Sequence, residues 1–508
     1  MYKRQGYNHR WKPGVHTLLL GGRLGVEQTL SDLQTNQLRV TRDSLGLGGA
    51  FFGGVNGSVQ FLDPTLNAEV QAATTSGGPV PGRLGPDGQT LVFTPALLNA
   101  VEPFLGTGAV NSVTSNDEVT FDFETRREFE IYNFDLQQVF QTEKNTLLFG
   151  GRALGGEVQA ESRLEAQVAT NDGFGFPASE DSFTFDFARF NAYLYDFYTP
   201  FEGLTLVGGV AWDWLQRPEN FRISPLSGET TVDQRVSGRA AFTYSPSSWF
   251  TARGIFSQGL GGISFDESVR LEPVQLGGFS QSFRTVLSES IAGSVEAPEF
   301  DTWGLSISGV LPTRTWWGVN VQDISQDVER QLGIFTGFQL TPQLFDRPVV
   351  FFPDNTSQRL EYEELQLTAT LNQLIGDHWA LGFRYRLTDS SLFEEIPDLG
   401  TSSRESAILH EATVSLNWND PSGWFGRLEG NWFHQELDDV FASDGSELEG
   451  DTFWQANLNL GYRFNDNTAE IGFSVLNLFD QDYQLSPLTP FLELPRERTF
   501  VVKCRYAF

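Results

Sequence analysis

Apolar and polar side chains alternate along many short stretches of the chain, and the last residues show this pattern most clearly. In 499–508, the positions Phe500, Val502, Cys504, Tyr506 and Phe508 interleave with Val501, Lys503, Arg505 and Ala507. Successive side chains of a β-strand point to opposite faces. The C-terminus is therefore predicted to be a strand with one apolar face and one largely cationic face.

The same period of two recurs throughout the chain. Its clearest further examples are 365–372, 379–388, 411–418, 454–464 and 470–475. Sustained helical periodicity is scarce, so the chain is predicted to be all-β. The sequence has no run of about 18 apolar residues, which excludes a helical membrane span.

Two kinds of connection alternate between the predicted strands. Turn-forming residues lie at 143–145, 245–248, 312–314, 376–377, 419–422 and 465–467, and long polar links lie at about 30–125, 166–183, 217–231, 260–299, 329–356, 392–403, 438–450 and 480–496. Short turns on one side and long loops on the other are typical of outer-membrane barrels. The link at 30–125 is too long for a plain hairpin connection. We expect part of it to fold over or into the bore, with a short helix at 93–106.

These patterns predict a transmembrane antiparallel up-and-down β-barrel of about sixteen or more strands. Tryptophans sit near predicted strand ends, where interfacial girdles belong: Trp212, Trp214, Trp249, Trp303, Trp316, Trp317, Trp379, Trp418, Trp424, Trp432 and Trp454. Polar faces rich in Arg and Asn would not fill a dry core, so we place them inward and the apolar faces toward lipid. The first counted strand lies near 15–28, and 7–11 is expected to end a preceding strand, which gives at least about eighteen in an even-numbered barrel.

Charge and candidate chemistry narrow the function. The net charge of −31 argues against a nucleic-acid partner, and the single Cys504 leaves no disulfide or thiolate metal cluster. The five histidines lack metal-type spacing. His410 and His434 share the lipid-facing parity of Ala412 and Trp432, so we expect them to pack among interfacial aromatics. The glycine stretches 48–57 and 259–265 and the acidic stretch 444–451 are expected to be loops. We predict no enzyme activity, no metal and no cofactor.

The charges on the inward face are the most informative candidates for function. They are Arg253, Arg384, Arg386, Glu411, Arg427, Glu429, Arg463, Glu470, Lys503 and Arg505. One interpretation is a mutually neutralising wall that keeps a bore solvated. The other is a selective path or a plug-docking surface, since charged groups that line a pore determine which solutes pass.

The C-terminal segment 459–508 resembles the end of TonB-dependent receptor barrels. The resemblance rests on Asn477-Leu478-Phe479-Asp480 with Tyr483, on Arg496 or Arg498 before the last strand, and on the closing Phe508. Tyr506 and Phe508 also resemble the signal that directs outer-membrane barrels to insertion. In 270–284, Leu271-Glu272-Pro273 stands where such receptors carry a Leu-Lys-Pro-Glu-like element. That departure is more similar to barrels fused behind tetratricopeptide repeats.

The resemblance implies a plug domain, TonB and energised uptake of iron chelates or cobalamin. The chain shows neither a plug nor a TonB box, and Met1–Gln5 resemble a translated adaptor. We therefore expect a non-native leader at 1–5 and a barrel domain at 6–508 that is the C-terminal part of a longer protein.

The expected function is an outer-membrane transport barrel for a small solute in a Gram-negative bacterium. A passive porin-like channel and an export or adhesion scaffold behind an N-terminal repeat domain are the alternatives. The expected partners are outer-membrane lipid, lipopolysaccharide bridged through divalent cations, the barrel-assembly machinery and, in the full-length protein, a plug and TonB.

Overall fold

A computed structural model describes most of the chain as β-strand. The described residues are 2–35, 38–42, 48–53, 60–61, 83–84, 91–92, 121–166, 179–221, 224–261, 270–280, 297–338, 350–397, 401–440, 448–464, 468–483, 485 and 497–506. Within these ranges, no helix is long and apolar enough to cross a membrane.

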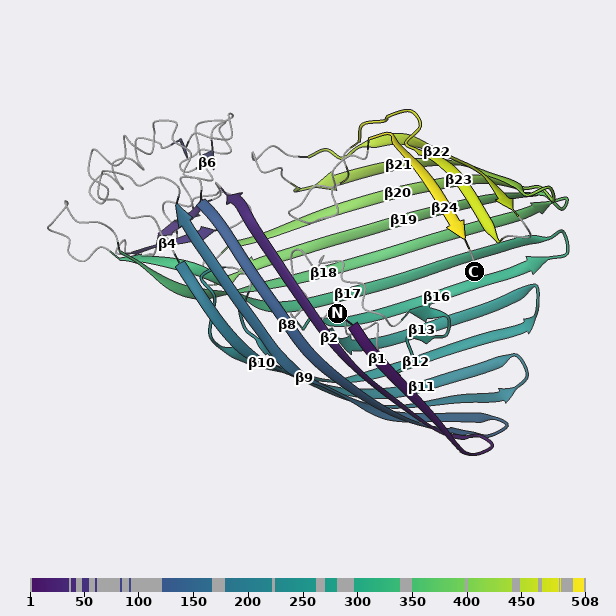
Figure 1. Cartoon of the computed structure of the whole chain (residues 1–508), viewed down its shortest axis with the longest axis horizontal. Helices are drawn as coiled ribbons and strands as arrows, with labels where there is room; N and C mark the ends of the chain where they lie inside the picture. The colour runs from purple at the N-terminus through teal and green to yellow at the C-terminus, as the bar shows by residue number, and fades with distance from the viewer. Residues whose placement is uncertain are drawn as a thin grey trace.

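Seventeen strands follow one another as a single antiparallel up-and-down sheet (Figure 1). They are β1 (Tyr2–Lys12), β2 (Val15–Thr35), β8 (Phe121–Gln141), β9 (Asn145–Ala166), β10 (Ser179–Phe201), β11 (Leu204–Pro218), β12 (Thr230–Ser247), β13 (Phe250–Leu260), β16 (Glu299–Leu311), β17 (Thr315–Phe338), β18 (Val350–Ile375), β19 (Trp379–Ile396), β20 (Thr401–Asn419), β21 (Trp424–Asp438), β22 (Thr452–Phe464), β23 (Ala469–Leu476) and β24 (Thr499–Tyr506). The predicted all-β, up-and-down architecture is confirmed. The strand expected to end at 7–11 is β1, which pairs with β2.

Short strands from the 30–125 region add to this sheet at its long-loop end. β4 (Gly48–Gly53) pairs with Phe335–Phe338 of β17, and β3 (Leu38–Arg42) joins β4 to β5 (Gln60–Phe61). β6 (Arg83–Leu84) and β7 (Leu91–Val92) form a separate small pair. The helix expected at 93–106, and an inward fold of the rest of this region, fall outside the described residues.

Short turns join the strands at one end, on the right in Figure 1, and longer connections join them at the other end except between β19 and β20, where the link 397–400 is also short. The strands reach farther into the long links than the sequence predicts. β17 and β18 are 24 and 26 residues long, so only 339–349 separate them, where a link of 329–356 is predicted. The strands continue because the backbone ladder persists although the outward side chains become charged. Asp327 and Glu361, for example, are directly paired across β17 and β18.

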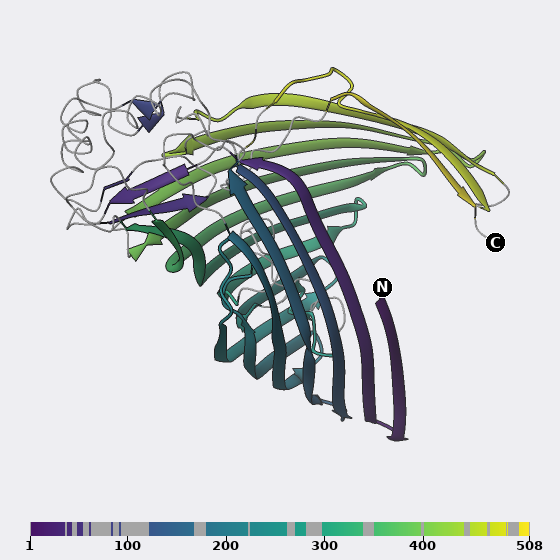
Figure 2. The same cartoon turned by 60° about the vertical axis from the view of Figure 1, so that its left-hand side comes forward.

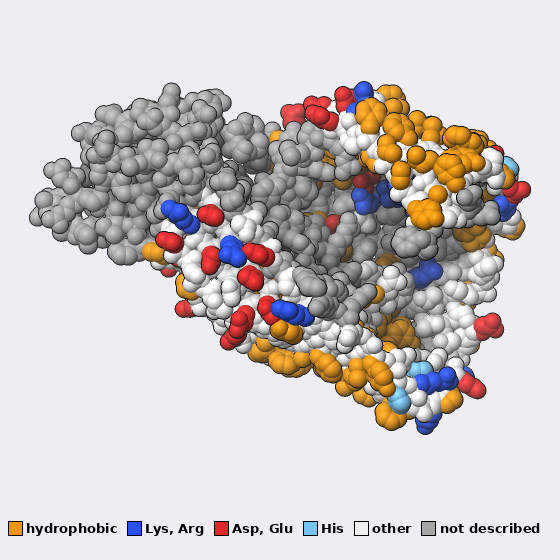
Figure 3. Space-filling view, in the orientation of Figure 1, with side chains coloured by type: hydrophobic (Ala, Val, Ile, Leu, Met, Phe, Trp, Pro, Cys, Tyr) orange, Lys and Arg blue, Asp and Glu red, His pale blue; other side chains and the backbone are white. Residues whose placement is uncertain are grey.

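The two faces of the C-terminal part of the sheet differ sharply in polarity. Leu460, Phe473 and Val502 stand opposite one another on three successive strands and are all well exposed on the outer, convex face. Arg463, Glu470 and Arg505 stand opposite one another on the other face. Figure 3 shows apolar side chains gathered over the outer surface of the C-terminal strands and basic side chains within the hollow. The alternation at the C-terminus therefore separates the two kinds of residue as the sequence predicts.

β1 and β24 form the two edges of the sheet (Figure 2). β24 pairs with β23, and no pairing between β1 and β24 exists among the described residues. Strands at the first and seventeenth positions of an antiparallel series run in the same direction. The structure therefore describes no pairing that joins the last strand to the first.

Gly155 and Gly156 offer a matched test of the register between β8 and β9. A Cβ atom on Gly156 would lie 2.0 Å from the Glu130 carbonyl oxygen and 2.8 Å from the Ile131 Cα, whereas a Cβ on Gly155 would meet nothing within 4 Å. We expect Gly156→Ala to lower the free energy of unfolding by about 1–3 kcal/mol, because backbone atoms must shift. Gly155→Ala should change it by less than about 0.5 kcal/mol.

The measurement is urea unfolding of the two variants in a mild detergent that covers the apolar outer face, followed by circular dichroism. Equal stabilities would contradict the pairing of Ile131 with Gly156.

Candidate functional site

A short hairpin from the connection between β13 and β16 packs against the concave face of the sheet. This docked hairpin, residues 270–280, contains β14 (Gln275–Leu276) and β15 (Phe279–Ser280). Leu276 and Phe279 are 1% and 5% exposed, because they pack against inward-facing side chains of β10 to β13. An inward fold is therefore present in the link between β13 and β16, whereas the sequence predicts one in the 30–125 link.

Glycines on both sides permit this close approach. Gly277 has a φ of 57°, a left-handed conformation that favours glycine, and a Cβ there would lie 2.9 Å from the Gly254 carbonyl oxygen. On the wall, a Cβ on Gly304 would lie 2.6 Å from the ring of Phe279. The hairpin thus rests against the sheet with little room between the two.

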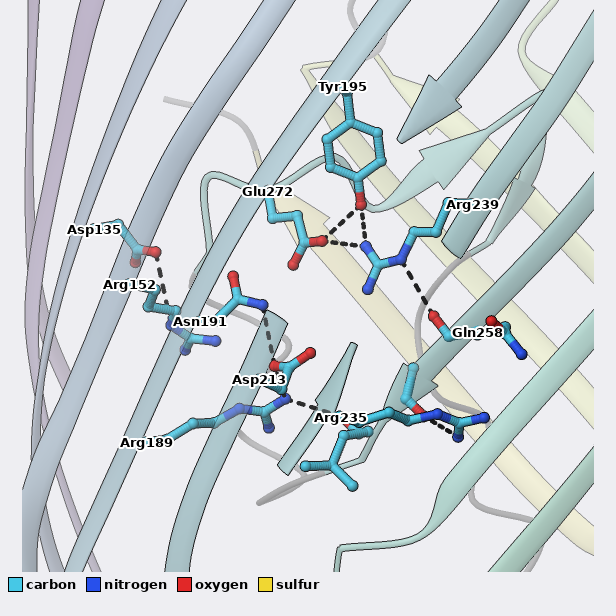
Figure 4. A network of polar contacts seen from close by, with 12 residues as sticks. Asp135, Arg152, Arg189, Asn191, Tyr195, Asp213, Arg235, Arg239, Gln258 and Glu272 are labelled. Atoms are coloured by element: carbon cyan, nitrogen blue, oxygen red, sulfur yellow. Dashed lines mark hydrogen bonds and ion pairs between the residues drawn. The ribbon is translucent and has the colours of Figure 1, made fainter. Parts of the chain in front are cut away.

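Glu272 anchors the docked hairpin to the wall (Figure 4). The Tyr195 hydroxyl donates a hydrogen bond of 2.6 Å to Glu272 Oε1. Arg239 Nη1 donates to the same carboxylate oxygen and to the Tyr195 hydroxyl, while its Nε donates to the Gln258 carbonyl at 3.3 Å. Glu272, Arg239 and Tyr195 are only 6%, 9% and 0% exposed. A separate hydrogen bond of 2.7 Å joins Gln137 Nε2 to the Leu271 carbonyl.

The charge of Glu272 is maintained by its surroundings. Burial alone would raise the pKa of Glu272, but the Arg239 and Arg270 charges and the hydrogen bond from Tyr195 hold it below its ordinary value of 4.5. A carboxyl group whose pKa is lowered in the folded state stabilises that state above its unfolded pKa. This contribution is lost as the pH falls through the lowered pKa.

A second buried network lies beside the first on β8 to β11. Arg189 Nη2 and Asn191 Nδ2 both donate to Asp213 Oδ1, at 2.9 and 3.0 Å, and Arg189 also donates to the Leu260 carbonyl at 2.9 Å. Asp135 and Arg152 form an ion pair of 3.7 Å on the two preceding strands. Buried charges need such partners because unpaired charges are costly away from water.

The ten inward charges predicted from the sequence share one face of the sheet according to the pairing register. Arg253 is opposite Ser306, and three acid–base pairs form among the rest: Arg386 with Glu411, Arg427 with Glu429, and Arg463 with Glu470. Arg384, Lys503 and Arg505 have no ion-pair partner among the described residues. Whether these residues line a path for solute stays a prediction.

The structure describes one of the two residues of the predicted insertion signal, Tyr506. Tyr506 is 67% exposed on β24, and Phe508 lies outside the described residues. Its role in insertion therefore stays a prediction.

The buried networks are not among the sites predicted from the sequence. In β10, Arg189, Asn191, Tyr193 and Tyr195 alternate with Phe190 and Leu194, so the period of two contained a signal that places the polar set inward. Asp213 lies between two tryptophans and carries the same signal. The sequence contains no such signal for Glu272, because this residue belongs to a link and its position depends on how that link folds.

His410 and His434 lie on the outer face within an aromatic cluster. The Tyr385 hydroxyl is 2.8 Å from His410 Nδ1, and both histidine rings lie near the ring of Trp432, with centroids 6.5 and 6.0 Å away. This is the packing that the sequence predicts. Among the described residues, no group of three or more His, Cys, Asp or Glu side chains is placed to hold a metal ion.

Known proteins resemble this chain in structure and not in sequence. No family model and no curated protein matches it. The ferric citrate transporter FecA, solved in the unliganded form, matches with a TM-score of 0.54 at 12% identity, over 99% of this chain and 60% of FecA. The copper transporter OprC (TM-score 0.48, 12% identity, 100% of this chain and 72% of OprC) and FpvA of Pseudomonas aeruginosa (0.48, 10%, 99% and 55%) match less well.

FecA, OprC and FpvA are TonB-dependent outer-membrane receptors. The chain spans about three fifths of the length of FecA. The sequence identity of 12% between the two limits the comparison to architecture. At that level, the resemblance first drawn from the C-terminal segment is confirmed, because the sheet has the fold of a TonB-dependent receptor barrel.

Proposed function

We propose that the chain forms an outer-membrane transport barrel that passes a small solute along its concave wall. The observation that carries this proposal is the opposite polarity of the two faces in the turn-proximal part of the sheet, where the outward side chains are apolar and the inward ones are polar. Leu416, Leu428 and Leu458 stand opposite one another on the outer face. In hydrocarbon, a closed barrel of such strands satisfies its backbone groups internally and presents apolar side chains to lipid.

The strand lengths support the same orientation. A tilted strand crosses a bilayer with about 9–11 residues, and β17 and β18 are more than twice as long. Their turn-proximal halves carry the outward apolar residues, while Asp327, Arg359 and Glu361 form an exposed outward ion-pair cluster nearer the long loops. The upper halves would therefore project beyond the membrane on the loop side.

The proposal includes partners that the full-length protein would need. Energised uptake requires a plug and TonB, and folding into the outer membrane requires the barrel-assembly machinery. Lipopolysaccharide would surround the strand halves that project beyond the membrane. A passive porin-like channel shares the barrel but needs neither the plug nor TonB, and an export or adhesion scaffold needs no solute path.

The lipid-facing assignment is tested by adding a charge to each face. Leu428→Arg places a charge on the outer face of β21 and should lower the stability of the lipid-inserted barrel by about 2–4 kcal/mol. Ser415→Arg is the matched control, because Ser415 points inward and is directly opposite Glu429. Guanidinium unfolding from phosphatidylcholine vesicles gives both values. Equal losses, or a larger loss for Ser415→Arg, would contradict the proposed orientation.

The inward cations should influence which ions pass. Replacing the cations Arg384, Lys503 and Arg505 by glutamine breaks no ion pair among the described residues and leaves the wall less positive. In planar bilayers under a KCl gradient, we expect this triple variant to shift the reversal potential toward cation preference.

The control for this experiment replaces three exposed cations at the short-turn end: Lys12→Gln, Lys144→Gln and Arg314→Gln. These substitutions should move the reversal potential less. A barrel that carries no current would count against a solute path along this wall. So would a reversal potential that the inward triple variant leaves unchanged.

The three functions differ in how cells expressing the full-length protein admit a small probe. Nitrocefin entry in porin-deficient cells, read from periplasmic β-lactamase, should rise on expression of a passive channel whether or not TonB is present. It should stay low through a plugged, TonB-dependent transporter until the plug is deleted, and a scaffold should leave it low in both cases. Entry that is high and independent of TonB would replace our proposal by the porin-like alternative.

A further inference from the structure

The wall beneath the docked hairpin is built like a recognition site for a carboxylate, and the chain itself supplies the carboxylate. Two wall donors, Arg239 Nη1 and the Tyr195 hydroxyl, converge on one oxygen of Glu272 (Figure 4). Guanidinium and phenol hydrogen bonds to an ionised carboxylate are among the strongest that proteins make. Glu272 reaches this position from a connection and not from the sheet.

The wall donors are held in place without Glu272. Tyr195 is on β10 and Arg239 is on β12, and Arg239 Nε donates to the Gln258 carbonyl of β13. The ring of Tyr195 also lies 5.7 Å from the guanidinium carbon of Arg239. The cradle is therefore part of the rigid sheet, and only the acid that fills it belongs to the hairpin.

A further guanidinium lies beside the cradle. Arg270 contributes to the field that keeps Glu272 ionised. Its buried Nε and Nη2 have no hydrogen-bond partner among the described residues. Because Arg270 belongs to the docked hairpin, it accompanies Glu272 and is not a donor of the wall itself.

We propose that this cradle recognises solutes that bear carboxylates, and that Glu272 occupies it as an internal competitor. A solute carboxylate that binds Arg239 and Tyr195 takes the place of the Glu272 carboxylate. The buried Arg239 guanidinium therefore keeps an anionic partner. Glu272 and the docked hairpin are then released from the wall. This inference rests on the proposed passage of solute along the concave face and names the chemical class of that solute.

Release of the hairpin can be followed through Leu276, which is buried when the hairpin is docked. We would introduce Leu276→Cys into a Cys504→Ser background and measure its reaction with a water-soluble maleimide in detergent micelles. Citrate is the probe, and chloride and inorganic phosphate at equal ionic strength are the controls. Citrate should accelerate the reaction by at least about fivefold, and adding Glu272→Gln should make the reaction fast without citrate.

Citrate binding measured by calorimetry gives a second readout that needs no engineered thiol. Glu272→Gln should bind citrate more tightly than the unaltered protein, because the competitor is gone, and Glu272→Gln with Arg239→Gln should lose that gain. Asp233→Asn is the matched control, because Asp233 forms its own ion pair of 2.8 Å with Arg217 and lies on the same strand as Arg239. It should leave citrate affinity unchanged.

Three results would overturn the inference. The first is a maleimide reaction rate that does not change with citrate, together with an unchanged citrate affinity for Glu272→Gln. The second is a hairpin that Glu272→Gln releases without any citrate binding, which would make Glu272 a structural clasp only. The third is an equal response to phosphate, which would indicate general anion attraction. These micelle assays need no membrane passage, so they fail or succeed independently of the bilayer experiments on the proposed function.

Discussion

The continuous antiparallel hydrogen-bond ladder is the constraint on which the rest of the structure depends. β9 and β10 stay in one register from Ser179 opposite Leu164 to Tyr198 opposite Asn145. A slip of one residue would exchange the two faces along the whole strand. The register of β9 and β10 brings Asn191 opposite Arg152, and that of β10 and β11 brings Asn191 opposite Asp213, while Phe190 and Leu194 remain exposed on the outer face.

The concave wall has two parts that differ in their exposure. On β10 to β13, the docked hairpin covers the wall, and Arg239 is 9% exposed with its charge fully engaged. On β19 to β24, the cations Arg384, Lys503 and Arg505 are exposed. The covered part pays a desolvation cost that only paired, hydrogen-bonded charges can offset, which explains why its arginines are so densely bonded. The open part resembles a solvated surface where single charges are tolerated.

The sequence predicted strands well where one face was apolar and poorly where it was not. The turns at 312–314 and 376–377 and the inward parity of Arg386 and Glu411 follow directly from a period of two. The long links were predicted to be longer than they are, because β17 and β18 continue with charged residues on their outward face. In these segments the apolar residues change face: Val328, Leu360 and Tyr362 are buried on the inward side, while the outward side is charged and the neighbouring strand still supplies the backbone hydrogen-bond partners.

The sequence by itself determined the all-β class, the side of the sheet on which the residues of the predicted strands lie and the asymmetry between short turns and long connections. These are local properties, since side-chain direction in a strand follows from backbone geometry alone. Only the tertiary structure decided that Glu272 meets Arg239, 33 residues earlier in the chain, and that β1 and β24 are edges. Both depend on packing between distant segments, where Leu276 and Phe279 find inward-facing small residues that no local pattern connects to them.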